Sequence, residues 1–452
     1  MQLVAYGAQD IYLTGNPQIT FFKVVYRRHT NFAVESIEQT YNGSAAKGSK
    51  ISVTVSRNGD LLSAVWLVNK RGADVTAAGA WATVDNVEVE IGGQVIDKQY
   101  GHWMQVWTDL SLGGDKSALL DDCLAADVSE AGGADVSYMP LQFWFCRNPG
   151  LALPLIALQY HEVKLNVTFA TLNANDSVSV WCDYVFLDTD ERRRMAQNPH
   201  EYLIEQLQFT GDESVGSSSN KIKLNFNHPV KELVWVVQPD ENVDYCASLE
   251  CGQPLYQVLG AQPFNYTDAI DALPNAVHAF GGLDQTSGEN AFITSSGVFE
   301  MDQAGTANGN ASWAGATAAG SSLSDAGTFV LAETALDMHC WGENPVVTAK
   351  LQLNGQDRFS EREGSYFDVV QPYQHHTRSP ETGINVYSFA VRPEEHQPSG
   401  SCNFSRIDNA VLQLVLSSGT VSGTNTAKVR VYAVNYNVLR VMSGMAGPAY
   451  SN

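Results

Sequence analysis

The chain has 452 residues, 44% of them hydrophobic, so two domains are expected and each can bury a core of its own. Its 27 basic and 49 acidic residues give a net charge of −22, which argues against direct packaging of nucleic acid because phosphates require a basic protein surface. The sequence has no apolar run of roughly 18 residues and begins without the basic and apolar segments of a secretory signal, so neither a membrane-spanning helix nor secretion is indicated.

The chain is expected to start with an N-terminal arm, residues 1–20, that contains Gly-Asn-Pro turn chemistry. Residues 19–26 (ITFFKVVY) have the composition of a strand, and the basic cluster Arg27, Arg28 and His29 follows. Nucleic acid or anionic lipid headgroups could meet this cluster. The acidic surplus favours salt bridges within or between subunits instead, which makes these three residues candidate assembly contacts.

Residues 50–68 (KISVTVSRNGDLLSAVWLV) predict two strands joined by a turn. Apolar and polar residues alternate in the first part, as in a strand with one buried face, and Asn58 and Gly59 supply the turn. A continuous apolar run centred on Trp66 follows. Residues 84–91 alternate again and end at a Gly-Gly hairpin signal, which predicts a further strand.

The rest of the first half predicts one short helix and three more strands. Residues 110–133 are acidic and rich in alanine, which favours a short helix within a surface excursion. Strands with alternating or clustered apolar residues are expected at residues 141–146, 162–169 and 177–186. An Asn-Pro pair at residues 198–199 marks the end of a first domain of residues 21–200.

Residues 221–237 (KIKLNFNHPVKELVWVV) repeat the pattern of residues 50–68. An alternating strand comes first, a proline break replaces the turn, and an apolar run is centred on Trp235 as the earlier one is on Trp66. This internal duplication predicts a second domain, residues 201–452, built like the first. The apolar flanks make Trp66 and Trp235 the expected core anchors of the two domains.

The second copy carries a long insertion, at about residues 260–348. The separation between matching features rises from 169 residues at the two tryptophans to 262 residues at the Gly-Gln pairs of residues 93–94 and 355–356. The inserted region is rich in Gly, Ala, Ser and Asn. A loop of this length inside a compact domain is usually functional or mobile, and a passive excursion is the alternative.

Many short strands, frequent turn signals and almost no helical periodicity predict an all-β protein. About eight strands per half suit a sandwich or a jelly roll, which limits exposed edges by packing two sheets face to face. The sequence pattern alone does not separate a jelly roll from an immunoglobulin-like sandwich.

Enzymatic constellations are poor, and no catalytic residue, metal ligand or cofactor site is expected. A catalytic jelly roll of the cupin kind needs two histidines one residue apart, and no His-x-His occurs among the ten histidines. His375 and His376 lie in a polar, proline-flanked segment and are expected at the surface. Glu394 and Glu395 are expected on a solvated face. Seven scattered cysteines fit reduced thiols in a cytosolic compartment better than a disulfide framework.

Three segments closely resemble the major capsid proteins of large nucleocytoplasmic double-stranded DNA viruses, including phycodnaviruses and iridoviruses. They are GAQDIYLTGNPQITFFKVVYRRHTNF at residues 7–32, NHPVKELVWVV at residues 227–237, and RIDNAVLQL with VRVYAVNYNVLRVMSGMAGPAY within residues 406–450. These motifs are long and lie at both ends and in the middle, so the resemblance spans nearly the whole chain. It implies a double jelly roll, that is, two tandem eight-stranded β-sandwiches with long inserted loops.

The resemblance further implies a homotrimer whose six similar lobes form a pseudo-hexagonal capsomer that tiles an icosahedral capsid. By similarity, residues 260–348 form the largest outward tower and residues 7–32 face the inner layer. The implied partners are neighbouring capsomers, minor capsid and penton proteins, an inner membrane layer, and a host receptor at the tower loops, without direct nucleic-acid contact. The implied location is the virion capsid, made and assembled in the host cytoplasm.

Six Asn-x-Ser/Thr sequons occur, at Asn42, Asn166, Asn175, Asn265, Asn310 and Asn403. Some members of the family carry glycans, so Asn265 and Asn310, which fall in the insertion, are candidate acceptors. The secretory glycosylation that reads such sequons is not expected without a signal peptide. Two other classes of function stay open, a receptor-binding or lectin-like module and a metal-dependent enzyme of the cupin kind.

Overall fold

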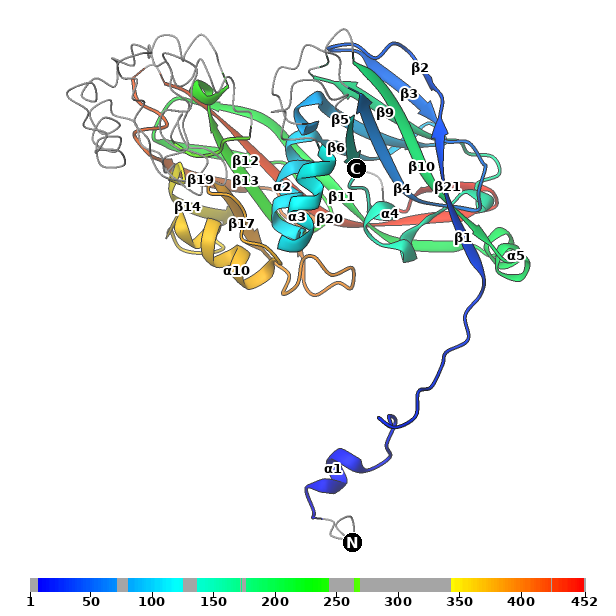
Figure 1. The fold of residues 1–452 in the computed structure, drawn as a ribbon. Helices are drawn as coiled ribbons and strands as arrows, with labels where there is room; N and C mark the ends of the chain where they lie inside the picture. Colours follow the sequence, from blue (N-terminus) through cyan, green and yellow to red (C-terminus); the bar gives the residue numbers. More distant parts are fainter. Residues whose placement is uncertain are drawn as a thin grey trace, which may run out of the picture.

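Two β-lobes and an extended N-terminal arm make up the molecule in a computed structural model (Figure 1). The structure describes residues 7–70, 80–124, 136–170, 172, 176–243, 264–268, 343–423 and 425–450. Most of the insertion expected at residues 260–348 therefore lies outside the described residues.

The first lobe is a sandwich of two five-stranded antiparallel sheets. Its strands are β1 (Phe32–Gln39), β2 (Tyr41–Asn42), β3 (Lys50–Thr54), β4 (Leu61–Lys70), β5 (Val84–Ile91), β6 (Gln94–Tyr100), β7 (Val136–Pro140), β8 (Leu153–Pro154), β9 (Val163–Phe169) and β10 (Ser177–Leu187). One sheet has the order β1–β10–β4–β7, with β8 beside β4, and the other has the order β2–β3–β9–β5–β6. Alternate residues of β3 and β10 are buried, which explains why these alternating sequences form strands.

The second lobe is also a sandwich of two antiparallel sheets, one with six strands and one with five. Its strands are β11 (His200–Val215), β12 (Ser219–Leu224), β13 (Pro229–Pro239), β14 (Val346–Leu353), β15 (Gln356–Asp357), β16 (Arg362–Glu363), β17 (Ile384–Ser388), β18 (Cys402–Asn403), β19 (Ala410–Leu416), β20 (Ala427–Met442) and β21 (Met445–Pro448). The six-stranded sheet has the order β11–β20–β13–β17, with β18 beside β13 and β21 beside β20. The other sheet has the order β12–β19–β14–β15, with β16 beside β14.

The two lobes share one strand order, which confirms the predicted duplication. In one sheet of each lobe, the path β1–β10–β4–β7 corresponds to β11–β20–β13–β17. In the opposing sheet, β3–β9–β5–β6 corresponds to β12–β19–β14–β15. The chain is therefore the expected double jelly roll.

The helices of the described residues are short and lie between strands or in the arm. They are α1 (Asp10–Thr14), α2 (Gly101–Ser111), α3 (Gly114–Leu124), α4 (Trp144–Arg147), α5 (Thr189–Gln197) and α10 (Gln371–His375), with a π-helix at Tyr366–Val370 and 3-10 turns at Ala80–Thr83, Pro149–Leu151, Leu155–Ala157, Asp240–Asn242 and Phe404–Arg406. The helix predicted within residues 110–133 is α3, whereas α2 was not predicted. At the start of α5, the Asp188 carboxylate accepts a hydrogen bond from the Thr189 N–H and complements the helix dipole.

Two predicted strands are wrong. Residues 19–26 form no strand, because no neighbouring segment among the described residues takes up their backbone hydrogen bonds. Residues 141–146 include part of α4, and the strand of this region, β7, ends before them at Pro140. The aromatic residues 143–145 suggested a strand because they are apolar. They are indeed buried in the first core, but they lack the alternation of a strand.

Each lobe has an apolar core between its sheets, and a third apolar cluster joins the lobes. In this third cluster, Trp103 and Trp107 of α2 pack with Val234 and Val236 of β13. The side chains that precede and follow these valines on β13 face the core of the second lobe. Helix α2 of the first lobe therefore covers the outer face of a central strand of the second lobe.

The C-terminal segment makes the reciprocal contact. Leu439 and Val441 of β20 and Ala446 of β21 belong to the core of the first lobe. The N–H of Tyr160 donates a 2.9 Å hydrogen bond to the carbonyl oxygen of Gly444 in the turn before β21. Each lobe thus buries residues supplied by the other.

The two tryptophans expected as core anchors do not occupy equivalent places. Trp235 is fully buried in the second core. Trp66 is only partly buried, because its neighbours Val65 and Leu67 face the first core and the alternation of β4 turns Trp66 to the other face. There its Nε1 donates a 3.2 Å hydrogen bond to Asp183. An alignment that pairs Trp66 with Trp235 is therefore one residue out of register. A shift of one residue exchanges the two faces of a strand.

Candidate assembly site

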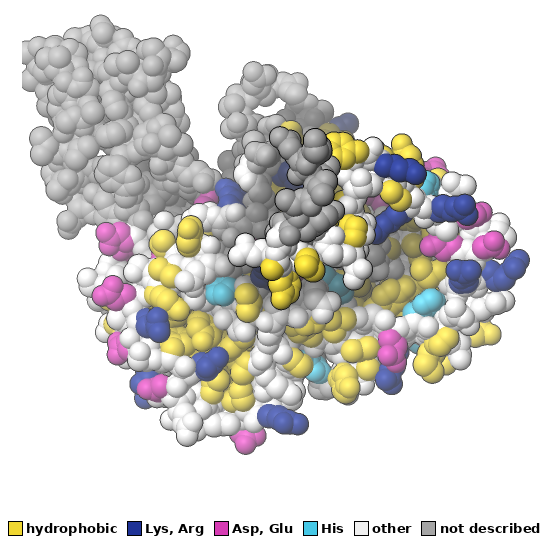
Figure 2. Space-filling model, turned by 90° about the horizontal axis from the view of Figure 1, so that it is seen from below, with side chains coloured by type: hydrophobic (Ala, Val, Ile, Leu, Met, Phe, Trp, Pro, Cys, Tyr) yellow, Lys and Arg dark blue, Asp and Glu magenta, His cyan; other side chains and the backbone are white. Residues whose placement is uncertain are grey.

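The N-terminal arm, which we define as residues 7–31, extends away from the first lobe (Figure 1). Phe21 and Phe22 are 91% and 98% exposed. Other large apolar side chains of the arm are also exposed, namely Ile11, Tyr12, Ile19, Val24, Val25 and Tyr26. From the side toward which the arm extends, hydrophobic side chains are visible on both lobes among the charged ones (Figure 2). Such a concentration of exposed apolar residues is typical of an assembly contact.

Arg27, Arg28 and His29 are exposed near the base of the arm. Nδ1 of His29 lies 3.0 Å from the carbonyl oxygen of Thr30, whose hydroxyl donates a 2.6 Å hydrogen bond to Glu191 of α5. Within the described parts of the chain, no salt bridge involves Arg27 or Arg28. Both guanidinium groups are therefore accessible to another molecule.

Asn265, one of the two candidate glycosylation residues, is buried, with 3% of its surface exposed. Its Oδ1 accepts hydrogen bonds from the backbone N–H and the hydroxyl of Thr267, at 3.0 and 2.6 Å. Because a transferase must reach the acceptor amide, Asn265 is not a suitable acceptor in the folded chain, contrary to the prediction. Asn310 lies outside the described residues.

A network of charged side chains is buried where the lobes meet. We define this junction network as Arg147, Glu205, Lys231, Glu232, His376 and Glu394. The side chain of Lys231 is 0% exposed, and its Nζ lies 2.7 Å from Oε1 of Glu205, whose Oε2 lies 3.1 Å from Arg147. The Arg147 guanidinium also lies 4.2 Å from the centre of the Trp107 ring, a favourable cation–π contact. Because Arg147 belongs to α4, these pairs connect the first lobe to the second.

A β-bulge in β13 positions the two consecutive charges of this network. The register between β13 and β20 shifts just before Glu232 and leaves Lys231 without a paired residue on β20. The Lys231 carbonyl instead accepts hydrogen bonds from the N–H groups of Phe389 and Ala390. Its Nζ donates a 2.6 Å hydrogen bond to the carbonyl of Pro393. The bulge therefore ties the loop after β17 to the centre of the junction.

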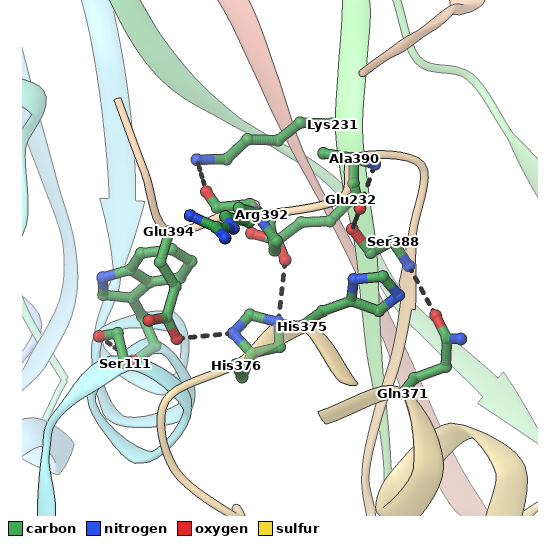
Figure 3. Close-up of polar contacts among 12 residues, drawn as sticks. Ser111, Lys231, Glu232, Gln371, His375, His376, Ser388, Ala390, Arg392 and Glu394 are labelled. Atoms are coloured by element: carbon green, nitrogen blue, oxygen red, sulfur yellow. Dashed lines mark hydrogen bonds and ion pairs between the residues drawn. The ribbon is translucent and has the colours of Figure 1, made fainter. Parts of the chain in front are cut away.

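His376 lies between two carboxylates (Figure 3). Its Nε2 is 3.1 Å from Oε2 of Glu232 and its Nδ1 is 2.9 Å from Oε1 of Glu394, and its side chain is completely buried, not at the surface as predicted. Burial alone opposes protonation, but the carboxylates of Glu232 and Glu394 outweigh it and raise the pKa of His376 to about 9. Burial acts to raise the pKa of Glu232, yet its contact with His376 holds that pKa below the usual value. With His376 protonated, three positive and three negative side chains balance in the network.

We expect the free energy of unfolding to decrease as the pH rises from 6.5 to 9. The pKa of His376 increases from 6.5 to about 9 on folding, so its contribution is complete below pH 6.5 and is lost as the pH rises through 9. The slope from this residue is at most about 1.4 kcal/mol per pH unit. Thermal unfolding of His376→Gln should show a flatter profile across this range, whereas His29→Gln, which changes an exposed histidine, should follow the unmodified protein. An unchanged slope in His376→Gln would contradict the assigned proton.

Sequence reasoning missed the junction network, although one signal for it was present. Lys231 and Glu232 directly precede the continuous apolar run centred on Trp235. Charges at the edge of such a strand have to find partners, because an isolated buried charge is very costly. The partners could not be identified from sequence spacing, since Glu205 and His376 lie far from them in the chain.

The described residues offer little for other chemistry. Among them, no cluster of three or more His, Cys, Asp or Glu side chains is arranged to hold a metal ion. None of the described helices has the length and apolar character needed to cross a membrane. Burial raises the pKa of the Cys146 thiol to about 12, so this cysteine is held in its unreactive form.

The presence of two jelly rolls in one chain defines the class of double jelly-roll proteins. In this chain the two rolls are joined through a buried junction, and the chain carries an exposed apolar arm. Residues 20–188 match the model described as the major capsid protein N-terminus, and residues 191–447 match that of the large eukaryotic DNA virus major capsid protein. The chain belongs to this family of major capsid proteins.

Individual relatives agree with this assignment along the whole chain. The identity is 61% to the major capsid protein of Phaeocystis pouchetii virus and 43% to that of Paramecium bursaria Chlorella virus 1, with 100% of this chain and 99% of each relative covered. A chain in a quasi-atomic model of the PBCV-1 virus capsid matches with a TM-score of 0.69 and 37% identity, over 96% of this chain and 100% of that one. The Faustovirus major capsid protein, at 10% identity and a TM-score of 0.64 over 97% of this chain and 94% of that one, shares the fold. The protein is thus a structural component of the virion capsid and not an enzyme.

Proposed function

We propose that three copies of this chain form a pseudo-hexagonal capsomer and that these capsomers tile an icosahedral capsid. The observation that supports this proposal is the shared strand order of the two lobes, because a trimer of such chains presents six similar lobes. Closed rotational symmetry is the usual arrangement of homo-oligomers. In this proposal the chain comprises an N-terminal segment of residues 1–20, a first roll of residues 21–200 and a second roll of residues 201–452.

The mass of the purified protein in solution tests the trimer. Light scattering coupled to size-exclusion chromatography should give about three chain masses, because a closed homo-oligomer has a discrete size. A protein that stays strictly monomeric at high concentration would count against the capsomer.

The arm is proposed to connect the capsomer to neighbouring capsomers or to minor capsid and penton proteins. Its exposed apolar side chains and free arginines support this role, because both are available to another molecule. Deleting residues 1–26 should leave the trimer and its unfolding temperature nearly unchanged, since no residue of this segment belongs to a core of the described structure. Assembly beyond the trimer, followed by electron microscopy and light scattering, should be lost.

A charge reversal separates a specific contact of the arm from a general effect of charge. Arg27→Glu combined with Arg28→Glu should weaken assembly beyond the trimer at least about tenfold, because the two new carboxylates would repel an acidic partner. Lys221→Glu combined with Lys223→Glu makes the same change of charge at two exposed positions of β12 and should have a much smaller effect. Equal losses in both double variants would show that net charge, and not the arm, controls assembly.

Residues 260–348, largely outside the described residues, are proposed to form an outward tower that a host receptor contacts. Removing residues 281–327 should preserve trimers and abolish attachment to host cells. The exposed arm would face the inner side of the shell, toward an internal membrane layer where one is present. Synthesis and assembly are proposed to take place in the host cytoplasm.

A further inference from the structure

A small polar cavity lies within the junction between the lobes. Its volume is about 10 Å³, enough for a single water molecule. The first lobe lines it with Gln99 of β6, Trp103 of α2 and Arg147 of α4. The second lobe lines it with residues of β11, among them Glu205, and with Val434 of β20. The cavity is thus lined by elements of both jelly rolls.

Three of the lining residues carry a buried polar atom without a hydrogen-bond partner among the described residues. These atoms are Oε1 of Gln99, Nε1 of Trp103 and Nε of Arg147. Gln99 is 3% exposed and Trp103 is 0% exposed, so bulk solvent does not satisfy them. Buried polar groups in native proteins are nearly always paired, with the protein or with an ordered water.

The identity of the missing partner follows from the chemistry of these atoms. Two N–H donors and one amide oxygen complement a water molecule, which can accept two hydrogen bonds and donate two. The second water proton has the Glu205 carboxylate as an acceptor on the same cavity wall. The N–H donors of Trp103 and Arg147 disfavour a metal cation, and the carboxylate of Glu205 disfavours an anion. We infer that the cavity binds one ordered water molecule that bridges the two jelly rolls.

This water extends the junction network to β6 and α2 of the first lobe. Arg147 and Glu205, which border the cavity, form a 3.1 Å ion pair of the network. Gln99 is held on the other side, because its Nε2 donates to Asp97 and to the carbonyl of Gln142. The water therefore links β6 and α2 to the charged pairs of α4 and β11. Its role is to fix the relative orientation of the two lobes.

A crystal structure of the full chain, at a resolution that shows ordered waters, tests the inference. We expect one peak within about 3.2 Å of Gln99 Oε1, Trp103 Nε1 and Arg147 Nε. An empty cavity, or direct hydrogen bonds that consume these three atoms, would overturn it. Crystals soaked in bromide should show no anomalous signal at this position, and a strong signal there would identify an anion site in place of the water.

A matched pair of substitutions then tests the role of the water. Val434→Ile adds one methyl group to the cavity wall and should remove the peak and lower the unfolding temperature by a few degrees. Val438→Ile makes the same change on the same strand, at a partly exposed position away from the cavity, and should preserve both. Loss of the peak without any decrease in unfolding temperature would show that the water does not stabilise the junction. The electron-density map of the unmodified protein shows whether the water is bound, even if Val434→Ile fails to fold.

Discussion

Replacing Lys231 by methionine should lower the free energy of unfolding by about 3–5 kcal/mol. Methionine keeps the length of the apolar stem but removes the charge 2.7 Å from Glu205, whose side chain is only 10% exposed. Glu205 would then depend on Arg147 alone, at 3.1 Å. The carbonyl of Pro393 would also lose its hydrogen bond from Nζ. A large effect follows because water does not replace a lost partner at a buried carboxylate.

Lys350→Met provides the matched control for this substitution. Lys350 lies at the same 2.7 Å from the carboxylate of Asp357, but both side chains are partly exposed, 26% and 41%. Its loss should cost much less than the loss of Lys231, because solvent screens exposed ion pairs. Denaturant unfolding of both variants, at equal protein concentration, gives the comparison. Similar costs for Lys231→Met and Lys350→Met would show that the junction network does not stabilise the protein.

The strands that expose one face could be predicted from the sequence with good boundaries. The strands predicted at residues 84–91 and 162–169 correspond to β5 and β9, because alternation of apolar and polar residues directly reports the two faces of a sheet. The hairpin after β5 was predicted from Gly92 and Gly93, which have φ values of +59° and +87°. The duplication followed from the same local patterns. The jelly-roll topology was implied only by the resemblance to major capsid proteins, because these patterns alone also fit an immunoglobulin-like sandwich.

Residues 19–26 show why composition alone failed at the arm. Their apolar side chains predicted burial in a strand, yet within this chain they are exposed, Phe22 almost completely. Burial against another molecule in the assembled shell would explain the apolar composition as well as burial in a sheet does. The sequence alone does not distinguish these two kinds of burial. The conflict between an apolar sequence and an exposed structure is therefore itself a signal of assembly.

The junction network was hidden for a different reason. Its members come from α4, β11, β13 and the loops around β17, and only the packing of one lobe on the other brings them together. Glu394 and His376 have the local sequence of a solvated loop, so their burial depends on the loop being tied to the bulge at Lys231. The same dependence applies to the inferred water site, whose lining residues come from both lobes.

Replacing Trp235 by alanine should cost about 3–5 kcal/mol of unfolding free energy, as large aromatic truncations in cores do. Its side chain is completely buried in the second core, with its ring centre 5.1 Å from that of Phe367. Both sheets of the lobe contribute to this core, so the cavity left behind can collapse only in part. Denaturant unfolding gives the cost, and the unfolding temperature should fall in parallel.

Trp66→Ala, which truncates the tryptophan at the corresponding place in the sequence, should cost only about 1 kcal/mol. Trp66 lies on the outer face of β4 and loses mainly one hydrogen bond to Asp183 and a partly exposed contact area. Val65 and Leu67, not Trp66, fill the first core, so Leu67→Ala should be the more damaging substitution in this lobe. Equal costs for Trp66→Ala and Trp235→Ala would contradict the one-residue difference in register, because the two side chains would then be packed alike. The expected inequality means that the duplicated lobes preserve strand order and buried faces while the largest side chain has moved from one face to the other.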